Sequence, residues 1–176
     1  MRLFTAIAFE SKTKEQISAL YEELESAGVT GNFTPVSNLH LTLKFLGEVD
    51  RSDIRRITAA LDTASAAVSS FELKADKCGF FTSRGEKTVW LGMNGEQLSK
   101  LAGAVDEEFS KIGFDPEKRQ FTPHITLIRR AVCDSAAISR IVVPEITVNV
   151  SSSTLFESRR DGGRLLYKPI HSASLK

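Results

Sequence analysis

Two segments of the sequence share one pattern: a histidine, an aliphatic residue, a threonine and a second aliphatic residue. They read His40-Leu41-Thr42-Leu43 and His124-Ile125-Thr126-Leu127. Imidazole is the side chain best suited to act as both acid and base near neutral pH. The chain contains 3 histidines, and the third, His171, is not followed by this pattern. The matched pair is therefore the first candidate for a chemical role.

Both segments predict β-strands with one polar and one apolar face. Side chains alternate between the two faces of a strand, so His40 and Thr42 point one way and Leu41 and Leu43 the other. The same alternation applies to the second segment. Each strand thus turns an aliphatic face toward a core and presents its histidine and threonine on the opposite face.

The elements that must position these segments alternate between strands and helices. Hydrophobic periodicity predicts strands at Arg2–Phe9, Leu39–Leu46, Phe71–Phe81, Lys87–Met93, Thr122–Arg129, Ile146–Phe156 and Leu165–Ile170. It predicts helices at Thr13–Ala27, Asp50 to about Ala67, Gln97–Ile112 and Ser135–Ile141. Turns are expected at Ser83–Glu86 and Arg160–Gly163, and Gly28 and Gly113 are expected to end helices.

The order of elements indicates an internal repeat. The two motif histidines are 124 − 40 = 84 residues apart in a chain of 176, close to half its length. Each is preceded by a strand and a glycine-terminated helix, and each is followed by a helix and another strand. We therefore expect one domain over residues 1–176, made of two copies of a unit at roughly 1–85 and 86–176.

Composition excludes several classes of protein. With 41% hydrophobic and 26% charged residues, the chain is typical of a soluble globular protein and not of a disordered one. A net charge of +1 does not indicate a protein that coats long nucleic acid through bulk charge. It leaves room for a local basic region that binds a short phosphate-bearing ligand.

The sequence indicates neither a metal nor a cofactor. Cys78 and Cys133 have no metal-ligand spacing, and no HExxH motif or phosphate-binding loop of the form GxxxxGK[ST] is present. Two isolated cysteines suit a reducing compartment, and no apolar run reaches the roughly 18 residues of a membrane span. We expect a cytoplasmic protein that binds no membrane.

The sequence resembles the two-histidine phosphoesterase superfamily, and within it the RNA 2′,3′-cyclic phosphodiesterases, long called 2′-5′ RNA ligases. The resemblance spans nearly the whole chain. It rests on Arg2-Leu3-Phe4 with Ala6-Ile7, the first motif within Asn38–Val49, Val89–Gly92, the second motif within Phe121–Arg129, Leu155–Ser158, the Gly162-Gly163 turn and Tyr167. The chain departs from the family pattern at Thr34-Pro35-Val36, where a more aromatic entry to the first motif is usual.

The resemblance implies an α+β fold with two pseudo-symmetric lobes of antiparallel sheet, outer helices and a central cleft. It implies metal-independent opening of an RNA terminal 2′,3′-cyclic phosphate to a 2′-phosphate, with weak reverse 2′-5′ ligation and a role in tRNA processing. His40 would protonate the departing oxygen and His124 would act as the base, although pseudo-symmetry allows the reverse. Thr42 and Thr126 would donate to non-bridging phosphate oxygens. We expect a monomer without cofactors.

Phe45 and Arg129 stand at equivalent positions, five residues after each histidine. A phenyl ring and a guanidinium plane at these places could hold a nucleobase between them. Strand alternation argues against this, because an odd offset puts both on the aliphatic face. By that alternation Phe45 is a core residue, whereas Lys44 and Arg130, at even offsets from the histidines, lie on the polar face. A charged Arg129 would then have to reach the site or a carboxylate.

Other functions remain open from the sequence. The same chemistry would suit a phosphodiesterase for small cyclic nucleotides, ADP-ribose cyclic phosphate or 2′-5′ oligoadenylates. A non-catalytic RNA-binding module with the same fold is a second alternative, disfavoured because both histidines and both threonines are intact. Arg159, Arg160 and Arg164 flank a glycine turn and could steer RNA, although an ordinary charged hairpin explains them equally well.

Overall fold

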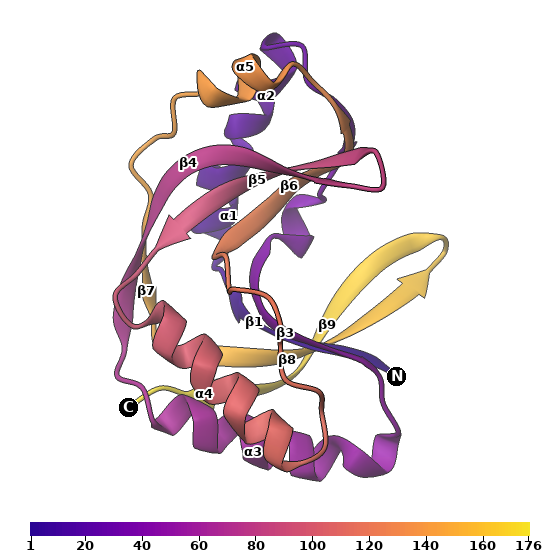
Figure 1. Ribbon diagram of the computed structural model, residues 1–176, viewed down its shortest axis with the longest axis vertical. Coiled ribbons are helices and arrows are strands. Elements are labelled where there is room, and N and C mark those ends of the chain that lie inside the picture. The colour runs from indigo at the N-terminus through magenta and orange to yellow at the C-terminus, as the bar shows by residue number, and fades with distance from the viewer.

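A computed structural model describes all residues from 1 to 176 (Figure 1). Its strands are β1 Arg2–Ala8, β2 Thr30–Phe33, β3 His40–Glu48, β4 Phe71–Ser83, β5 Glu86–Asn94, β6 His124–Val132, β7 Thr147–Val150, β8 Ser152–Asp161 and β9 Arg164–Ser174. Its α-helices are α1 Ser11–Ser18, α2 Leu20–Ser26, α3 Ile54–Ala66, α4 Leu98–Lys111 and α5 Ser135–Ser139. Short 3₁₀ turns lie at Val36–Asn38 and Arg51–Asp53.

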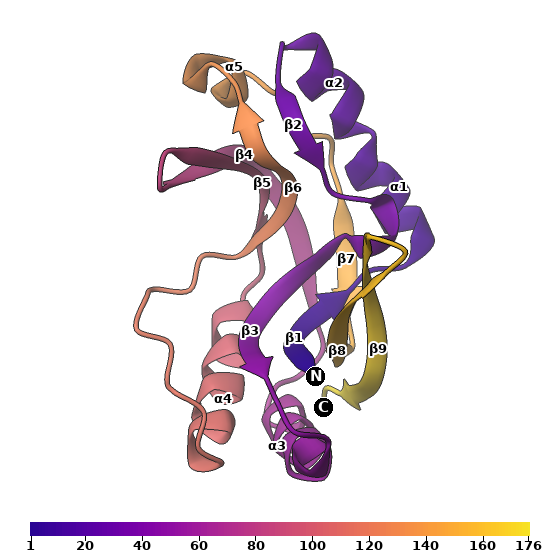
Figure 2. The same ribbon diagram turned by 90° about the vertical axis from the view of Figure 1, so that its right-hand side faces the viewer.

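One antiparallel sheet contains all the strands, in the order β7-β4-β5-β6-β3-β1-β8-β9, with β2 added beside β6. The predicted α+β class with antiparallel strands and helices is therefore confirmed. The two motif strands, β3 and β6, lie side by side at the centre of this order (Figure 2). On either side of them the order is matched, because β1 and β5, then β8 and β4, then β9 and β7 occupy equivalent places.

The two halves of the sheet do not correspond to the two halves of the sequence. Strand β4 comes after the first motif strand in sequence, but it pairs with β5 and β7 of the other side. Strand β8 comes after the second motif strand, but it pairs with β1. Each half of the sheet thus receives two strands from the other half of the chain: β2 and β4 join the side of β6, and β8 and β9 join the side of β3. The division into repeats at about residue 85 stays a prediction.

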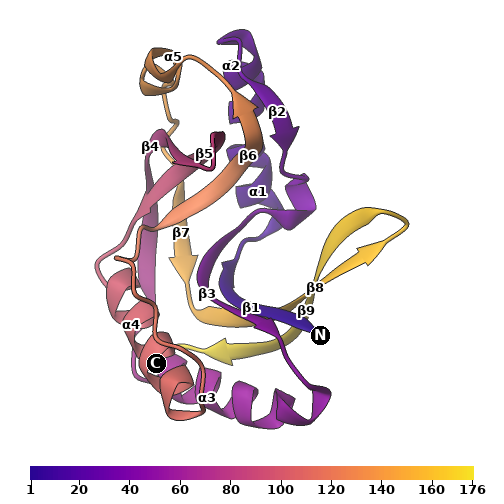
Figure 3. The same cartoon turned by 45° about the vertical axis from the view of Figure 1, so that its right-hand side comes forward.

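Helices α3 and α4 pack together at one end of the molecule, and α1 and α2 line another side (Figures 1 and 3). Helix α4 forms because its apolar residues recur every three or four positions, which gives one continuous apolar stripe. That stripe is buried in the core and consists of Leu98, Leu101, Ala102, Val105 and Phe109. No helix combines the length and the apolar character that crossing a membrane requires.

Most predicted elements are confirmed to within a few residues, with two corrections. The predicted strand Ile146–Phe156 is two strands, because the chain passes at Ser151 from the edge of one half of the sheet to β8 in the other. The predicted helix Thr13–Ala27 is divided into α1 and α2 at Ala19. Strand β2 was not predicted, since its short sequence Thr-Gly-Asn-Phe is largely exposed and acquires strand geometry by pairing with β6.

Both motif strands contain an extra residue at the same place. In β3, Thr42 pairs with Ala6 and Lys44 with Thr5, so Leu43 has no partner of its own in β1. In β6, Thr126 pairs with Trp90 and Ile128 with Val89, so Leu127 is likewise unpaired. Such β-bulges reverse the alternation of side chains beyond them.

The bulges overturn the parity prediction for the residues that follow. Lys44 turns into the core and is only 9% exposed, whereas Phe45 turns to the face of His40 and is 67% exposed. The predictions that Phe45 belongs to the core and that Lys44 shares the histidine side are therefore wrong. Arg129 is exposed beyond the equivalent bulge. Arg130 adopts a left-handed backbone with φ of 51° and lies 3.5 Å from a Glu86 oxygen.

Buried Lys44 connects β3 to α4. Its ammonium forms an ion pair with Asp106 and donates to the Asp115 carbonyl at 2.7 Å. Asp106 also accepts from the Glu117 amide at 3.0 Å. Burial alone would raise the pKa of Asp106, but the hydrogen bonds from Lys44 and Glu117 outweigh it and leave that pKa below its usual value. The pair thus fixes the first motif strand against the segment that leads to the second.

We predict that Asp106→Asn destabilises the protein by about 2–4 kcal/mol, because it leaves the buried Lys44 ammonium without a counter-charge. Urea unfolding measures this change. Asp53→Asn is the matched control, since Asp53 pairs with Arg56 at 2.9 Å on the surface and its loss should cost under about 1 kcal/mol. Equal effects of the two substitutions would contradict the structural role of the buried pair.

Candidate active site

The motif residues of β3 and β6 share one face of the sheet. The two strands pair at Leu41 and Ile125, which are both fully buried. Continuing this antiparallel register by one residue in each direction sets His40 beside Thr126 and His124 beside Thr42. Diagonal neighbours in such a pair have Cβ atoms about 7–8 Å apart. We call the surface formed by His40, Thr42, His124 and Thr126 the histidine face.

Both imidazoles are held in the same way. His40 Nδ1 donates to the Asn38 carbonyl at 2.7 Å, and His124 Nδ1 donates to the Thr122 carbonyl at 2.7 Å. A carbonyl oxygen can only accept, so each Nδ1 carries a hydrogen and each Nε2 has the free lone pair of a neutral ring. His40 Nε2 lies 3.0 Å from the Thr42 hydroxyl, which can donate to it.

Both histidines have pKa values below the ordinary range. Burial lowers the pKa of His40 to about 4; the bond to the Asn38 carbonyl opposes this shift, while the charges of Arg129, Lys14 and His124 add to it. Burial also lowers the pKa of His124, again with a contribution from Arg129. Arg129 contributes to both shifts and His124 to that of His40, in keeping with the adjacent places of β3 and β6 in the sheet. This positive surrounding disfavours added cations and favours an anion.

Phe45, on β3, and Arg129, on β6, both lie near the histidines. The Phe45 ring lies 6.0 Å from the ring of Phe4, which in turn lies 4.9 Å from His40. Arg129 is near enough to both histidines to lower their pKa values. The structure therefore places His40, Thr42, His124, Thr126 and Arg129 on the two adjacent motif strands, with Phe45 linked to His40 through the ring of Phe4.

Aromatic rings support each histidine; the sequence had given Tyr167 and Trp90 as parts of the family resemblance, whereas Phe81 was not identified. Tyr167 meets the ring of His40 edge-on at 5.0 Å. On the other side Phe81 meets His124 edge-on at 5.0 Å, and Trp90 lies 6.4 Å from it. These rings come from distant strands, so no local pattern relates them to the motifs. They restrict the motion of the imidazoles and exclude water from one side of each ring.

Two polar residues near His40 were also missed. Asn38 is only 4% exposed; its carbonyl holds His40, and its side-chain amide donates to the Leu165 carbonyl at 2.7 Å. Lys14 donates to the Ser37 carbonyl at 2.7 Å and contributes positive charge at His40. Asn38 belongs to the first motif segment, but its sequence gave only a turn signal. Lys14 lies on α1, and no motif or spacing in the sequence marks it as a site residue.

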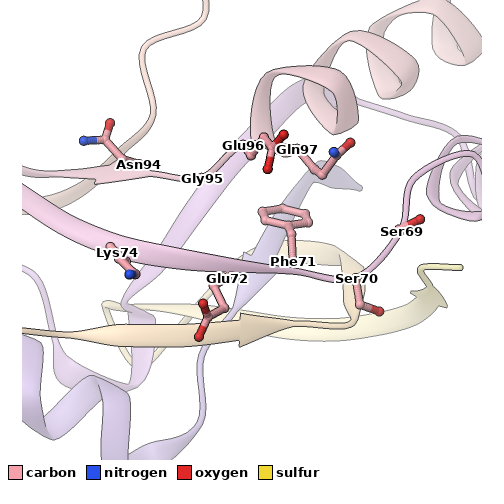
Figure 4. A pocket seen from close by; sticks show the side chains of 9 residues that line it. All are labelled: Ser69, Ser70, Phe71, Glu72, Lys74, Asn94, Gly95, Glu96 and Gln97. Carbon is pink, nitrogen blue, oxygen red and sulfur yellow. The ribbon is translucent and has the colours of Figure 1, made fainter.

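The remaining candidates lie elsewhere. His171 Nε2 lies 2.7 Å from an Asp62 oxygen on the surface, in an arrangement unrelated to the motifs. No group of three or more His, Cys, Asp or Glu side chains is arranged to hold a metal ion. An open polar hollow of about 560 Å³ lies between the segment that leads into α4, the start of β4 and the end of β5. Figure 4 shows the side chains that line it. None of the motif residues lines it.

A model of the LigT like Phosphoesterase family matches the chain twice, at residues 7–91 and 91–167. The chain belongs to this family. A Methanothermobacter thermautotrophicus relative named RNA 2′,3′-cyclic phosphodiesterase is 35% identical over 131 residues, which cover 73% of this chain and 71% of the relative. A Thermotoga maritima protein of the same name is 31% identical over 181 residues, covering 100% of this chain and 96% of the relative.

A solved structure of this LigT-like family has the same fold. Escherichia coli LigT in complex with 3′-AMP superimposes with a TM-score of 0.79 and 29% identity, covering 99% of this chain and 97% of that one. The predicted family resemblance is confirmed.

We predict that NMR of the imidazole nitrogens finds His40 and His124 as neutral rings with hydrogen on Nδ1 at pH 7. Because burial and nearby cations disfavour the charged form, His40 should titrate near pH 4 and His124 below 6.5. Resonances are assigned with His40→Gln and His124→Gln. A His40 ring that is half protonated at pH 6.5, or that carries its hydrogen on Nε2, would contradict the described geometry.

Proposed function

We propose that this protein is an RNA 2′,3′-cyclic phosphodiesterase that uses His40 and His124 as an acid–base pair. The observation that carries the proposal is the shared arrangement of the two rings. Each has its Nδ1 bound to a backbone carbonyl two residues upstream, which leaves each Nε2 unprotonated in the neutral ring; that of His40 lies 3.0 Å from the Thr42 hydroxyl. The names of the relatives support the substrate class.

The reaction requires two proton transfers at one phosphorus. One imidazole removes a proton from water while the water oxygen bonds to phosphorus. The bond from phosphorus to the ribose 3′ oxygen breaks, and the second, protonated imidazole gives its proton to that oxygen. The product is a 2′-phosphate with a free 3′ hydroxyl. If the ribose 5′ hydroxyl of another strand attacks the cyclic phosphate in place of water, the same groups would support 2′-5′ ligation.

The assignment of His40 as acid and His124 as base follows the family resemblance. In the free protein both rings are expected to be neutral at pH 7. A bound phosphodiester carries one negative charge, which raises the pKa of a neighbouring imidazole and favours its protonation. The Nδ1 bonds hold each ring in place in either protonation state, since Nδ1 remains a donor throughout. The opposite assignment would use the same geometry.

The other residues of the histidine face would bind the substrate. Thr42 and Thr126 hydroxyls would donate to the non-bridging oxygens, where charge increases in the transition state. Arg129 would supply positive charge to the same phosphate, and its guanidinium plane would pair with the exposed Phe45 ring around a nucleobase. The exposure of Phe45 after the bulge supports this role. We propose that the reaction needs no metal, as the family resemblance implies.

We predict that kcat/KM is highest in mildly acidic solution and falls above about pH 6.5. In the productive form of the free protein, one imidazole is protonated and the other is neutral. The pKa values of both imidazoles lie below 6.5. That form is therefore most abundant between the two values, and it declines about tenfold per pH unit above the higher one. A pH–rate profile on a cyclic-phosphate substrate tests this, and a maximum above pH 8 would contradict it.

We predict that His40→Ala and His124→Ala each lower turnover by about 10²–10⁴-fold, because each removes one proton-transfer group. The assay uses an oligonucleotide ending in a 2′,3′-cyclic phosphate, with chelator present, and identifies the phosphate isomer formed. His171→Ala is the matched control, since its ring is bound to Asp62 outside the motifs. Turnover that survives either motif substitution, or that is lost with chelator alone, would refute the proposed mechanism.

A further inference from the structure

The hairpin of β8 and β9 extends beyond the rest of the sheet. Strand β1 pairs with β8 only as far as Ser158, opposite Arg2, whereas β8 and β9 remain paired to Asp161 and Arg164. Strand β9 is the edge of the sheet. Residues 159–166 therefore form a projecting two-stranded segment, seen in yellow in Figure 3, which we call the arm.

One face of the arm extends the surface on which Tyr167 contacts the His40 ring. The β8–β9 pairing is regular from Phe156 to Asp161, so side chains alternate without interruption. Tyr167, which contacts the His40 ring, faces the same way as its partner Ser158. The next pair on this face is Arg160 with Leu165. Arg160 thus lies about 7 Å further along the arm than the aromatic contact to His40.

Arg160 on this face has no carboxylate across from it. On the opposite face Glu157 pairs with Lys168 and Asp161 with Arg164, while Arg159 stands opposite the apolar Leu166. Arg160 stands opposite the apolar Leu165, and none of the ion pairs in the structure includes it. The histidine side of the arm therefore presents one guanidinium that has no carboxylate partner and donates only to the Gly163 carbonyl at 3.4 Å, on the same face as Ser158.

The arm is attached to the candidate active site by a specific hydrogen bond. The buried Asn38 side chain donates to the Leu165 carbonyl at 2.7 Å, and the Asn38 carbonyl holds the His40 ring. This bond fixes the position of the Arg160–Leu165 pair relative to the imidazole. A ligand bound along the arm would therefore be in register with the reacting phosphate.

We propose that the arm binds the RNA strand on the 5′ side of the reacting nucleotide, with Arg160 on a backbone phosphate. This inference rests on the proposed function. A cyclic phosphate occupies the 3′ end of its strand, so every other phosphate of the substrate lies on the 5′ side. A guanidinium forms paired hydrogen bonds with phosphate oxygens, and Ser158 supplies a further donor. A mononucleotide has no such phosphate and gains nothing from the arm.

The test compares two substrates, a trinucleotide ending in a 2′,3′-cyclic phosphate and the matching mononucleoside 2′,3′-cyclic phosphate. The measured quantity is the ratio of their kcat/KM values. Arg160→Ala should lower this ratio about tenfold, the order expected for one charged hydrogen bond. It should also reduce the salt dependence for the trinucleotide, by a slope of roughly 0.7 for one lost contact. The matched control is Arg159→Ala, which removes the same charge from the opposite face.

The outcomes separate this inference from the proposed function. A wild-type protein that acts on neither substrate would contradict the proposed function. If the wild type acts on both and Arg160→Ala leaves the ratio unchanged, the arm does not bind the strand, although the proposed function stands. Equal effects of Arg159→Ala and Arg160→Ala would also overturn the inference, since they would reflect general charge and not a site on the histidine side of the arm.

Discussion

The arrangement described here depends on the contact between the two central strands. A single ladder position, Leu41 opposite Ile125, joins β3 to β6. Both side chains are completely buried, so a shift by one residue would expose them and turn the histidines into the core. The register is therefore fixed by apolar burial on one face, while the polar face carries the imidazoles. The hydrophobic core thus determines the distance between the proposed catalytic groups.

A second constraint concerns charge. Burial and the neighbouring cations Arg129 and Lys14 oppose protonation of His40, so the free protein holds a neutral ring in a positive environment. Such an arrangement has an energetic cost that an anionic ligand relieves. The hydrogen bonds to the Asn38 and Thr122 carbonyls keep the rings oriented whether or not a ligand is bound. Preorganisation of this kind is what electrostatic catalysis requires.

The sequence predicted the element order and the shared face of the motif residues because both follow from local periodicity. It could not predict the bulges at Leu43 and Leu127, since the segments Leu43-Lys44 and Leu127-Ile128 read as regular strand until the partner strand is known. The positions of Phe45 and Lys44 were misjudged for this reason.

The role of Asn38 and the direction of the arm depend on contacts 127 residues apart in the chain. Likewise, the rings of Phe81 and Trp90 approach His124 only after β4 and β5 have paired with each other and β5 with β6. Long-range pairing, not local preference, decides these features. The sequence therefore identified the groups proposed to act on the substrate better than the groups that hold them.

The central claim is that both imidazoles act on the same phosphorus as one unit. The most direct measurement is a double-mutant comparison of turnover in His40→Ala, His124→Ala and the combined variant. Residues that act together are non-additive, so the double variant should be about as slow as the slower single one. If the loss of turnover in the double variant equals the product of the two single losses, the two histidines act independently, and this would contradict the central claim.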